Sequence, residues 1–197
     1  DIGTNAIRLF ISNVEEYPTE TLFKKIAFLR VPIRLGEDVF TTGEIGQQKG
    51  KRLCETMQGF SYIMSAFNVE SYKAYATCAM REARNGKSVA EQIQKECDLN
   101  IEIISGTKEA ETIFAGGMNE VVDDDKTYLY VDVGGGSTEV IVYSKSVKVE
   151  ACSFPLGTVR MLNDAMDKEE MKHFKKWLKN ITEKYTPDAI IGSGGNI

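Results

Sequence analysis

Two similar motifs in this sequence each join an aspartate to a turn that contains glycine. The first is Asp1-Ile-Gly-Thr-Asn-Ala, and the second is Asp132-Val-Gly-Gly-Gly-Ser-Thr. Glycine lets the backbone bend tightly and present its N–H groups to an anion, and the aspartate can hold a divalent cation or orient a water. One such turn would more often be a plain hairpin. With a third glycine-rich loop from Gly192 to Gly195, the repetition predicts two related lobes that bind phosphate groups in one cleft.

Two better-known phosphate-binding loops are excluded by their spacing. Gly86-Lys87-Ser88 resembles the end of a Walker A loop, but Arg81 stands where that loop requires its first glycine. The run that begins at Gly134 has Glu139 where a dinucleotide-binding fingerprint requires its last glycine, and a strand rather than a helix is expected to follow. The predicted phosphate site is therefore of neither kind.

The charge and histidine content excludes several classes of protein. The chain has 24 Lys and Arg against 29 Asp and Glu, a net charge of -5, whereas a nucleic-acid binder normally carries a basic excess. We therefore expect no nucleic-acid partner. His173 is the single histidine, so a Ser-His-Asp triad, a histidine-ligated metal or a histidine acid–base pair would depend on it alone. If the protein is an enzyme, its chemistry should rest on carboxylates.

Cysteine spacing and hydropathy predict a cytoplasmic protein. The four cysteines, at positions 54, 78, 97 and 152, contain no Cys-x-x-Cys pair, which argues against a zinc site and a disulfide framework and predicts buried, reduced thiols. Charges interrupt the apolar stretches well before about 18 residues, and no basic and apolar leader opens the sequence. We therefore expect no membrane partner.

The elements that would position these motifs alternate between strand and helix. Apolar runs predict strands at residues 6–13, 21–31, 71–77, 101–104, 127–133, 137–144, 147–154 and 189–191. Helical periodicity predicts helices at residues 45–69, 87–97, 107–121 and 167–185. The first two strands should form a hairpin, and those between 127 and 154 an antiparallel meander. The alternation as a whole indicates an α/β fold.

An acidic run marks the boundary between the two predicted lobes. The apolar pattern lapses at Asp123-Asp124-Asp125, next to a strong strand, so we predict one lobe at residues 1–124 and another at residues 125–197. In the second lobe, Asp167 and Glu170 stand at capping-box spacing at the start of a helix. His173 falls off the apolar face of that helix, where we expect it to be solvated.

Six motifs follow one another along the chain. They are Asp1-Ile-Gly-Thr-Asn-Ala-Ile-Arg-Leu, Arg34-Leu-Gly-Glu, Ala76-Thr-Cys-Ala-Met-Arg-Glu-Ala, Ile104-Ser-Gly-Thr-Lys-Glu-Ala, Val131-Asp-Val-Gly-Gly-Gly-Ser-Thr-Glu and Gly192-Ser-Gly-Gly. Together they resemble the motifs of the exopolyphosphatase and guanosine pentaphosphate phosphatase family. The resemblance implies an α/β protein with two ribonuclease-H-like lobes of the actin, Hsp70 and sugar-kinase fold, an interlobe cleft, and a second lobe that is incomplete here. The sequence departs from the family at Thr4, Ala6 and Lys108.

The resemblance also implies roles for individual residues. Glu109 would be the base that activates an attacking water, and Arg81 would lie beside the leaving phosphate. Mg²⁺ would be associated with Asp132, Glu139 and Asp1. Phosphate would be bound by Gly3, Thr4, Asn5, Gly134, Gly135, Gly136, Ser137, Thr138 and Gly194. Without the resemblance, Glu109 would be read as a carboxylate favoured by the helix dipole and Arg81 as a solvated helix residue.

The implied activity is that of a hydrolase that removes terminal phosphate from inorganic polyphosphate. Guanosine pentaphosphate is the alternative substrate, and a kinase or ATPase of the same superfamily or a non-catalytic phosphate sensor are further alternatives. Kinases of this fold commonly supply an aspartate as base, whereas Glu109 occupies that position here, which favours water as the acceptor. The resemblance also implies a homodimer.

Overall fold

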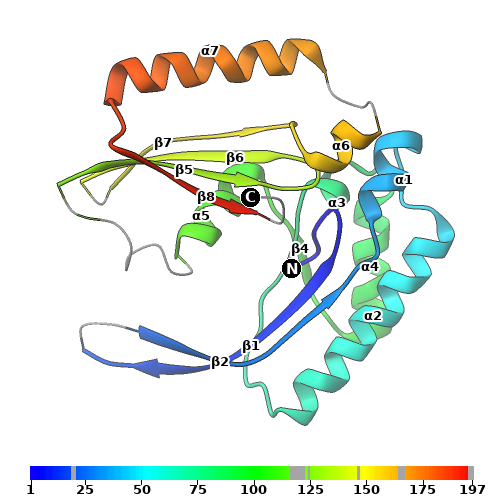
Figure 1. Ribbon diagram of the computed structural model, residues 1–197. Helices are drawn as coiled ribbons and strands as arrows, with labels where there is room; N and C mark the ends of the chain where they lie inside the picture. Colours follow the sequence, from blue (N-terminus) through cyan, green and yellow to red (C-terminus); the bar gives the residue numbers. More distant parts are fainter. Residues whose placement is uncertain (19–20, 116–122, 124, 146, 164–166, 195–197) are drawn as a thin grey trace. The chain divides into compact units, whose positions relative to one another are not determined.

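The computed structural model describes residues 1–18, 21–115, 123, 125–145, 147–163 and 167–194. It consists of two compact units, Asp1–Ile103 and Ile104–Ile197, shown in Figure 1. Among the described residues, no helix is both long and apolar enough to cross a lipid bilayer.

The strands of the first unit form two pairs that are joined by one residue. β1 (Ile7–Glu16) and β2 (Thr21–Val31) form the predicted antiparallel hairpin, and β3 (Ala74–Ala76) lies parallel to β4 (Ile101–Ile103). Ile2 bridges antiparallel to Ile7 and parallel to Ala76, so the first glycine motif lies where the two pairs meet.

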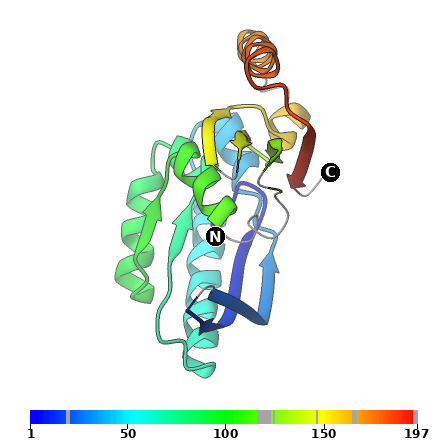
Figure 2. The ribbon, with the colours of Figure 1, turned by 90° about the vertical axis from the view of Figure 1, so that its left-hand side faces the viewer.

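Four helices accompany these strands. They are α1 (Leu35–Thr42), α2 (Gln47–Ala66), α3 (Cys78–Glu82) and α4 (Gly86–Cys97), and Figure 2 shows α2 and α4 running alongside the strands. The predicted apolar stripe of α2 is confirmed at Leu53, Met57 and Phe60, which are buried in the core of the unit. Phe67, which lies within the helix predicted at residues 45–69, is exposed and follows the end of α2 at Ala66.

The second unit contains a four-stranded sheet in the order β7-β6-β5-β8. β5 (Thr127–Val133), β6 (Thr138–Ser144) and β7 (Val147–Phe154) form the predicted antiparallel meander. β8 (Ala189–Gly194) pairs with β5 in parallel orientation. The third glycine-rich loop therefore begins beside the end of β5, where the second glycine motif also begins.

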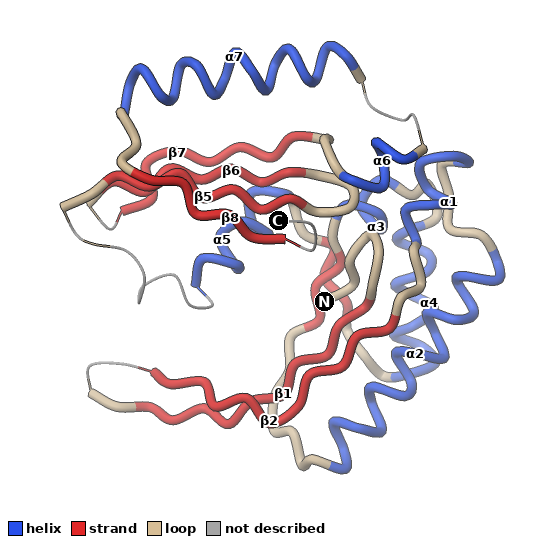
Figure 3. Tube along the Cα trace, in the orientation of Figure 1, coloured by secondary structure: helices blue, strands red, loops and turns tan. Residues whose placement is uncertain are grey.

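A helix covers each face of this sheet, as Figure 3 shows. α7 (Lys168–Tyr185) packs Phe174, Trp177 and Ile181 against one face, and α5 (Gly106–Ala115) packs Ala110 against the other. The two faces follow from the alternation of side chains along a strand. His173 is mostly exposed, as predicted, although its ring meets that of the buried Phe154 edge-on at 5.5 Å.

The units divide at a different point from the predicted lobes. The helix α5 belongs to the second unit because it packs against β6 and β7, whereas the sequence prediction placed residues up to 124 in the first lobe. The division into two related lobes at residues 124 and 125 stays a prediction. Residues 116–121 of the helix predicted at 107–121, and Gly195, lie outside the described part of the chain.

The cysteines are free thiols, as predicted. Cys54, Cys78 and Cys97 are buried, and Cys152 is partly buried. Burial raises the pKa of Cys54 to about 11, so this thiol is protonated and unreactive at neutral pH.

Candidate functional site

The two glycine motifs form the same backbone turn in their respective units. The N–H of Gly3 donates to the carbonyl of Ala6 at 3.2 Å, and the N–H of Gly134 donates to the carbonyl of Ser137 at 2.9 Å. Each turn joins two paired positions, since Ile2 bridges to Ile7 in the first unit and Val133 pairs with Thr138 in the second. The repetition seen in the sequence is therefore also a repetition of local structure.

The start of a short helix holds the carbonyl groups of the second turn. In α6 (Thr158–Leu162), the N–H groups of Thr158 and Val159 donate to the carbonyls of Gly134 and Gly135 at 3.1 and 2.8 Å. The Nε of the buried Arg160 side chain donates to the carbonyl of Gly136 at 2.6 Å. Three successive carbonyls are thus fixed by one element.

The first turn is held in the same way. The N–H of Gly36, in the first turn of α1, donates to the carbonyl of Thr4 at 2.9 Å, and the N–H of Arg34 donates to the carbonyl of Asn5 at 2.9 Å. In both units a Leu-Gly pair at the beginning of a helix lies against the turn.

Three consecutive N–H groups of the second turn have no acceptor within the part of the chain that the structure describes. Within the described residues, the N–H groups of Gly135, Gly136 and Ser137 donate no hydrogen bond, although the carbonyls of this turn are bonded. Successive N–H groups in a turn can form a concave anion-binding site. By contrast, the hydroxyl of Thr138 donates to the carbonyl of Leu156 at 2.6 Å, so its proton is not free to bind phosphate in this arrangement.

Gly157 allows α6 to approach this turn, and its replacement should displace the turn. A Cβ at Gly157 would lie 2.4 Å from the carbonyl oxygen of Gly135 and 2.5 Å from the carbonyl carbon of Gly136. Because both neighbours are backbone atoms, we expect Gly157→Ala to lower the free energy of unfolding by about 1–3 kcal/mol in urea denaturation.

Gly59→Ala is the matched control, because a Cβ there meets nothing within 4 Å and the position lies inside α2. The free energy of unfolding of this variant should rise by about 0.4–1 kcal/mol. Equal stability of Gly157→Ala and the wild type would contradict the close approach of α6 to the turn.

A single row of polar side chains runs across all four strands beside the second turn. Register pairs Ser153 with Glu139, Glu139 with Asp132, and Asp132 with Ser193, from β7 to β8. Ser153 donates to Oε1 of Glu139 at 2.8 Å, and Ser193 donates to Oδ1 of Asp132 at 2.6 Å. Two predicted metal ligands therefore lie directly opposite one another, with a serine on either side.

The helix α5 places Glu109 over the same face of the sheet. A Cβ at Gly106 would lie 2.3 Å from Oγ of Ser153 and 3.7 Å from Oε1 of Glu139, so the first turn of α5 rests on the polar row. Glu109 follows on the same side of the helix, and its neighbour Ala110 is buried against the sheet. The half-buried Glu109 thus belongs to the same unit and the same sheet face as Asp132 and Glu139.

The two carboxylates suit a magnesium ion that also binds substrate. Mg²⁺ is usually held by one or two carboxylates together with phosphate oxygens and waters. Like charges placed directly opposite in a sheet repel, and a divalent cation would offset this repulsion between Asp132 and Glu139. No group of three His, Cys, Asp or Glu side chains in the described ranges could hold a metal ion, so phosphate or water would have to complete the coordination.

The remaining predicted residues are distributed between the units. Asp1, Gly3, Thr4, Asn5 and Arg81 belong to the first unit. There the carboxylate of Asp1 forms an ion pair with Arg8 at 3.0 Å, Thr4 is buried and Asn5 is exposed, and Arg81 lies in α3.

Gly194 belongs to the second unit and ends β8. It has a φ of +129° and lies so close to the carbonyl of Val133 that a Cβ would come within 2.4 Å of its oxygen. Only glycine adopts this conformation readily.

Sequence reasoning did not single out five residues that shape this site. They are Gly106, Ser153, Gly157, Arg160 and Ser193. Gly106 and Ser193 lie inside motifs that the sequence already marked, so a closer reading of those motifs could have found them. Ser153 and Arg160 carried no signal, because their contacts depend on strand register and on a short helix.

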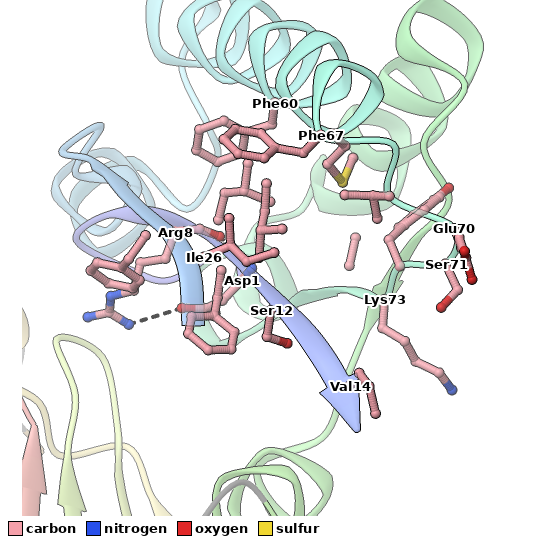
Figure 4. A pocket seen from close by; sticks show the side chains of 18 of the residues that line it. Asp1, Arg8, Ser12, Val14, Ile26, Phe60, Phe67, Glu70, Ser71 and Lys73 are labelled. Atoms are coloured by element: carbon pink, nitrogen blue, oxygen red, sulfur yellow. Dashed lines mark hydrogen bonds and ion pairs between the residues drawn. The ribbon is translucent and has the colours of Figure 1, made fainter. Parts of the chain in front are cut away.

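The first unit also contains a large pocket, but its charges do not suit phosphate. The pocket, of about 1040 Å³, lies between β1, the end of α2 and residues 69–75, and is shown in Figure 4. Its positively charged residues are Arg8 and Lys73. Its acidic residues are Asp1, Glu15, Glu16 and Glu70. The glycine turn and polar row of the second unit are therefore the better candidate site.

Comparison with protein families and curated proteins gives consistent matches. The model of the Ppx/GppA phosphatase family matches residues 14–194. The chain is 30% identical to a bifunctional 3-dehydroquinate synthase/phosphatase of Fusobacterium nucleatum, over 99% of this chain and 32% of that protein. It is 26% identical to exopolyphosphatase 1 of Mycobacterium tuberculosis, over 98% of this chain and 59% of that protein.

Solved structures agree with these matches. An exopolyphosphatase from Cytophaga hutchinsonii superposes with a TM-score of 0.85 at 26% identity, covering 98% of this chain and 64% of that one. A Ppx/GppA family member from Aquifex aeolicus superposes with a TM-score of 0.76 at 26% identity, with the same coverage. The chain therefore spans less than two thirds of the length of these relatives. The predicted fold class, an α/β fold of the actin, Hsp70 and sugar-kinase type, is confirmed.

Proposed function

Because the chain belongs to the Ppx/GppA phosphatase family, we propose that it is the part of an exopolyphosphatase that binds and hydrolyses the terminal phosphate of inorganic polyphosphate. The names of several relatives support this substrate, since proteins called exopolyphosphatase match most of this chain. Guanosine pentaphosphate is the second candidate, because it presents the same terminal phosphoanhydride.

One observation carries the proposal. The turn with N–H groups directed to no partner in the described chain is continuous with the strands that hold Asp132 and Glu139 opposite one another. An anion site and a pair of carboxylates therefore share one hairpin. This combination suits phosphoryl transfer, since charge on the phosphate oxygens must be offset while the attacking group is held in line.

Each residue of the site would then have a separate role in the reaction. The N–H groups of Gly135, Gly136 and Ser137 would bind oxygens of the terminal phosphate. Glu109 would take a proton from a water molecule while the oxygen of that water attacks the terminal phosphorus. The bond between this phosphorus and the bridging oxygen would then break. The role that the resemblance gives Arg81, neutralising the shortened polyphosphate that leaves, suits its fixed positive fork and stays a prediction, because Arg81 belongs to the first unit. Asp132 and Glu139 would hold Mg²⁺, which would supply further charge neutralisation, whereas the part of Asp1 in orienting its hydration stays a prediction, because Asp1 belongs to the first unit.

A hydrolase fits this set of residues better than a kinase does. The proposed base is a glutamate in the first turn of α5. If water is the nucleophile, no other molecule is needed to accept the phosphoryl group. A phosphate sensor would need the anion site but not Glu109. Assembly into a homodimer and a cytoplasmic location are further parts of the proposal.

Parallel phosphate-release assays test the proposal. The full-length protein is incubated with Mg²⁺ and either inorganic polyphosphate or guanosine pentaphosphate, without any acceptor. We expect phosphate to be released from polyphosphate, and faster than from the nucleotide. Turnover of the nucleotide alone would reverse the substrate assignment, turnover only with an added acceptor would indicate a kinase, and binding without turnover would indicate a sensor.

A further inference from the structure

Asp132 is held less firmly by packing than its partner Glu139. Glu139 is only 1% exposed and is enclosed by Ser153 and the first turn of α5, whereas Asp132 lies half-buried at the end of β5. An aspartate side chain in that position can rotate unless a hydrogen bond fixes it. The bond from Ser193 is therefore the contact that sets the orientation of this carboxylate.

The direction of the hydrogen bonds around Ser193 follows from the groups involved. A carboxylate only accepts, so the Ser193 hydroxyl must donate its proton to Oδ1 of Asp132. The Tyr130 hydroxyl lies 2.6 Å from the same serine oxygen and must then donate to it. Tyr130 is buried on the sheet face below Asp132, so it fixes the serine from inside the core.

We propose that Tyr130 and Ser193 are positioning residues that orient the Asp132 carboxylate for a divalent cation. The inference rests on the proposed function, because that function gives Asp132 a cation to bind. Groups that hydrogen-bond to metal ligands fix their orientation, and their loss typically lowers metal affinity or activity about 10–100-fold. The relay, meaning the two hydrogen bonds from Tyr130 to Ser193 and from Ser193 to Asp132, also connects β8 to the proposed cation ligand Asp132 on β5.

A direct role of Ser193 in binding phosphate predicts a different result. Its proton is used by Asp132 at 2.6 Å, so a phosphate would have to displace that bond. Loss of the hydroxyl would then raise the KM for polyphosphate and leave cation affinity unchanged. Measurement of cation binding without substrate separates the two roles.

The test measures Mn²⁺ binding to the full-length protein in the absence of substrate, with electron paramagnetic resonance as the method of detection. We expect Ser193→Ala to weaken Mn²⁺ binding at least about tenfold. Tyr130→Phe should weaken Mn²⁺ binding less, but in the same direction. In this variant Ser193 still donates to Asp132 but no longer accepts a hydrogen bond from Tyr130. Ser193→Thr, which restores a hydroxyl, should recover most of the affinity.

Ser144→Ala is the matched control. Ser144 lies at the other end of β6, where its hydroxyl bonds to that of Thr127 at 3.0 Å, and it touches neither carboxylate. This variant should bind Mn²⁺ as the wild type does.

Two outcomes would overturn the inference, and they are distinguishable. Wild-type affinity in Ser193→Ala, with phosphate release still Mg²⁺-dependent, overturns the relay but leaves the proposed function intact. Absence of Mn²⁺ binding by the wild type overturns both. If Ser193→Ala does not fold, Tyr130→Phe is used instead, since it preserves the shape of the core. Unchanged Mn²⁺ affinity in Tyr130→Phe would then overturn the relay.

Discussion

Glu109→Gln in the full-length protein is expected to lower kcat by about a hundredfold to ten-thousandfold, the usual contribution of a general base. Glutamine keeps the size of the side chain and most of its helix propensity but cannot accept the proton from water. Binding of polyphosphate should persist, because it depends on turn N–H groups and the cation rather than on this carboxylate. Steady-state assays and a binding measurement on the same preparation test both halves of the prediction.

Stability separates this role from that of a carboxylate near a helix N-terminus. Loss of the favourable dipole interaction in the first turn of α5 should cost only about 0.3–1 kcal/mol. Glu111→Gln is the control, because Glu111 lies on the same helix but is exposed and paired with Lys148. Its kcat should stay within about threefold of wild type, a small part of a general-base effect. A similarly small change in Glu109→Gln would mean that another group activates the water.

Long elements with a clear apolar pattern could be predicted from the sequence. The strands at residues 127–133 and 147–154 have the predicted bounds, because Lys126 and Gly134 flank the first and Pro155 follows the second. The hairpin of β1 and β2 and the apolar stripe of α2 were recognisable for the same reason. In each case the periodicity extends over enough residues to separate strand from helix.

Short helices could not be predicted in this way. The helices α1, α3 and α6 span eight, five and five residues, which is too few for a period of 3.6 to be visible. Two of these helices hold the glycine turns, so the elements that fix the candidate anion site were the least visible ones. A Leu-Gly pair is a local signal for these two helices, because it begins α1 and immediately precedes α6.

The candidate site was predictable only where it is local in sequence. Asp132 and Glu139 flank one turn, so a hairpin with the register observed here brings them opposite one another. Ser193 reaches Asp132 only because β8 pairs in parallel with β5, after a helix of 18 residues has intervened. Parallel pairing of distant strands leaves no local pattern, so the contact of Ser193 with Asp132 could not be predicted even though Ser193 lies inside a marked motif. The contact of Ser153 with Glu139 depends instead on the register of β7.

Glu139→Gln should affect cation dependence and activity together. Glu139 is almost completely buried, and the glutamine oxygen can still accept the bond from Ser153, so we expect the fold to persist. Removal of one of two carboxylate ligands should raise the Mg²⁺ concentration for half-maximal activity at least about tenfold, since even groups that only support ligands have effects of that size. The measurement is a Mg²⁺ titration of phosphate release.

Thermal stability gives a second, independent result for the same variant. Without Mg²⁺, the wild type carries two opposed carboxylates, so Glu139→Gln should be as stable as the wild type or more stable, by up to about 1 kcal/mol. With Mg²⁺, the wild type should gain stability by mass action and the variant should gain less. Glu150→Gln is the control, because Glu150 lies on β7 but pairs with Lys184 and should leave the Mg²⁺ response unchanged. A wild-type Mg²⁺ titration and full activity in Glu139→Gln would remove Glu139 from the site.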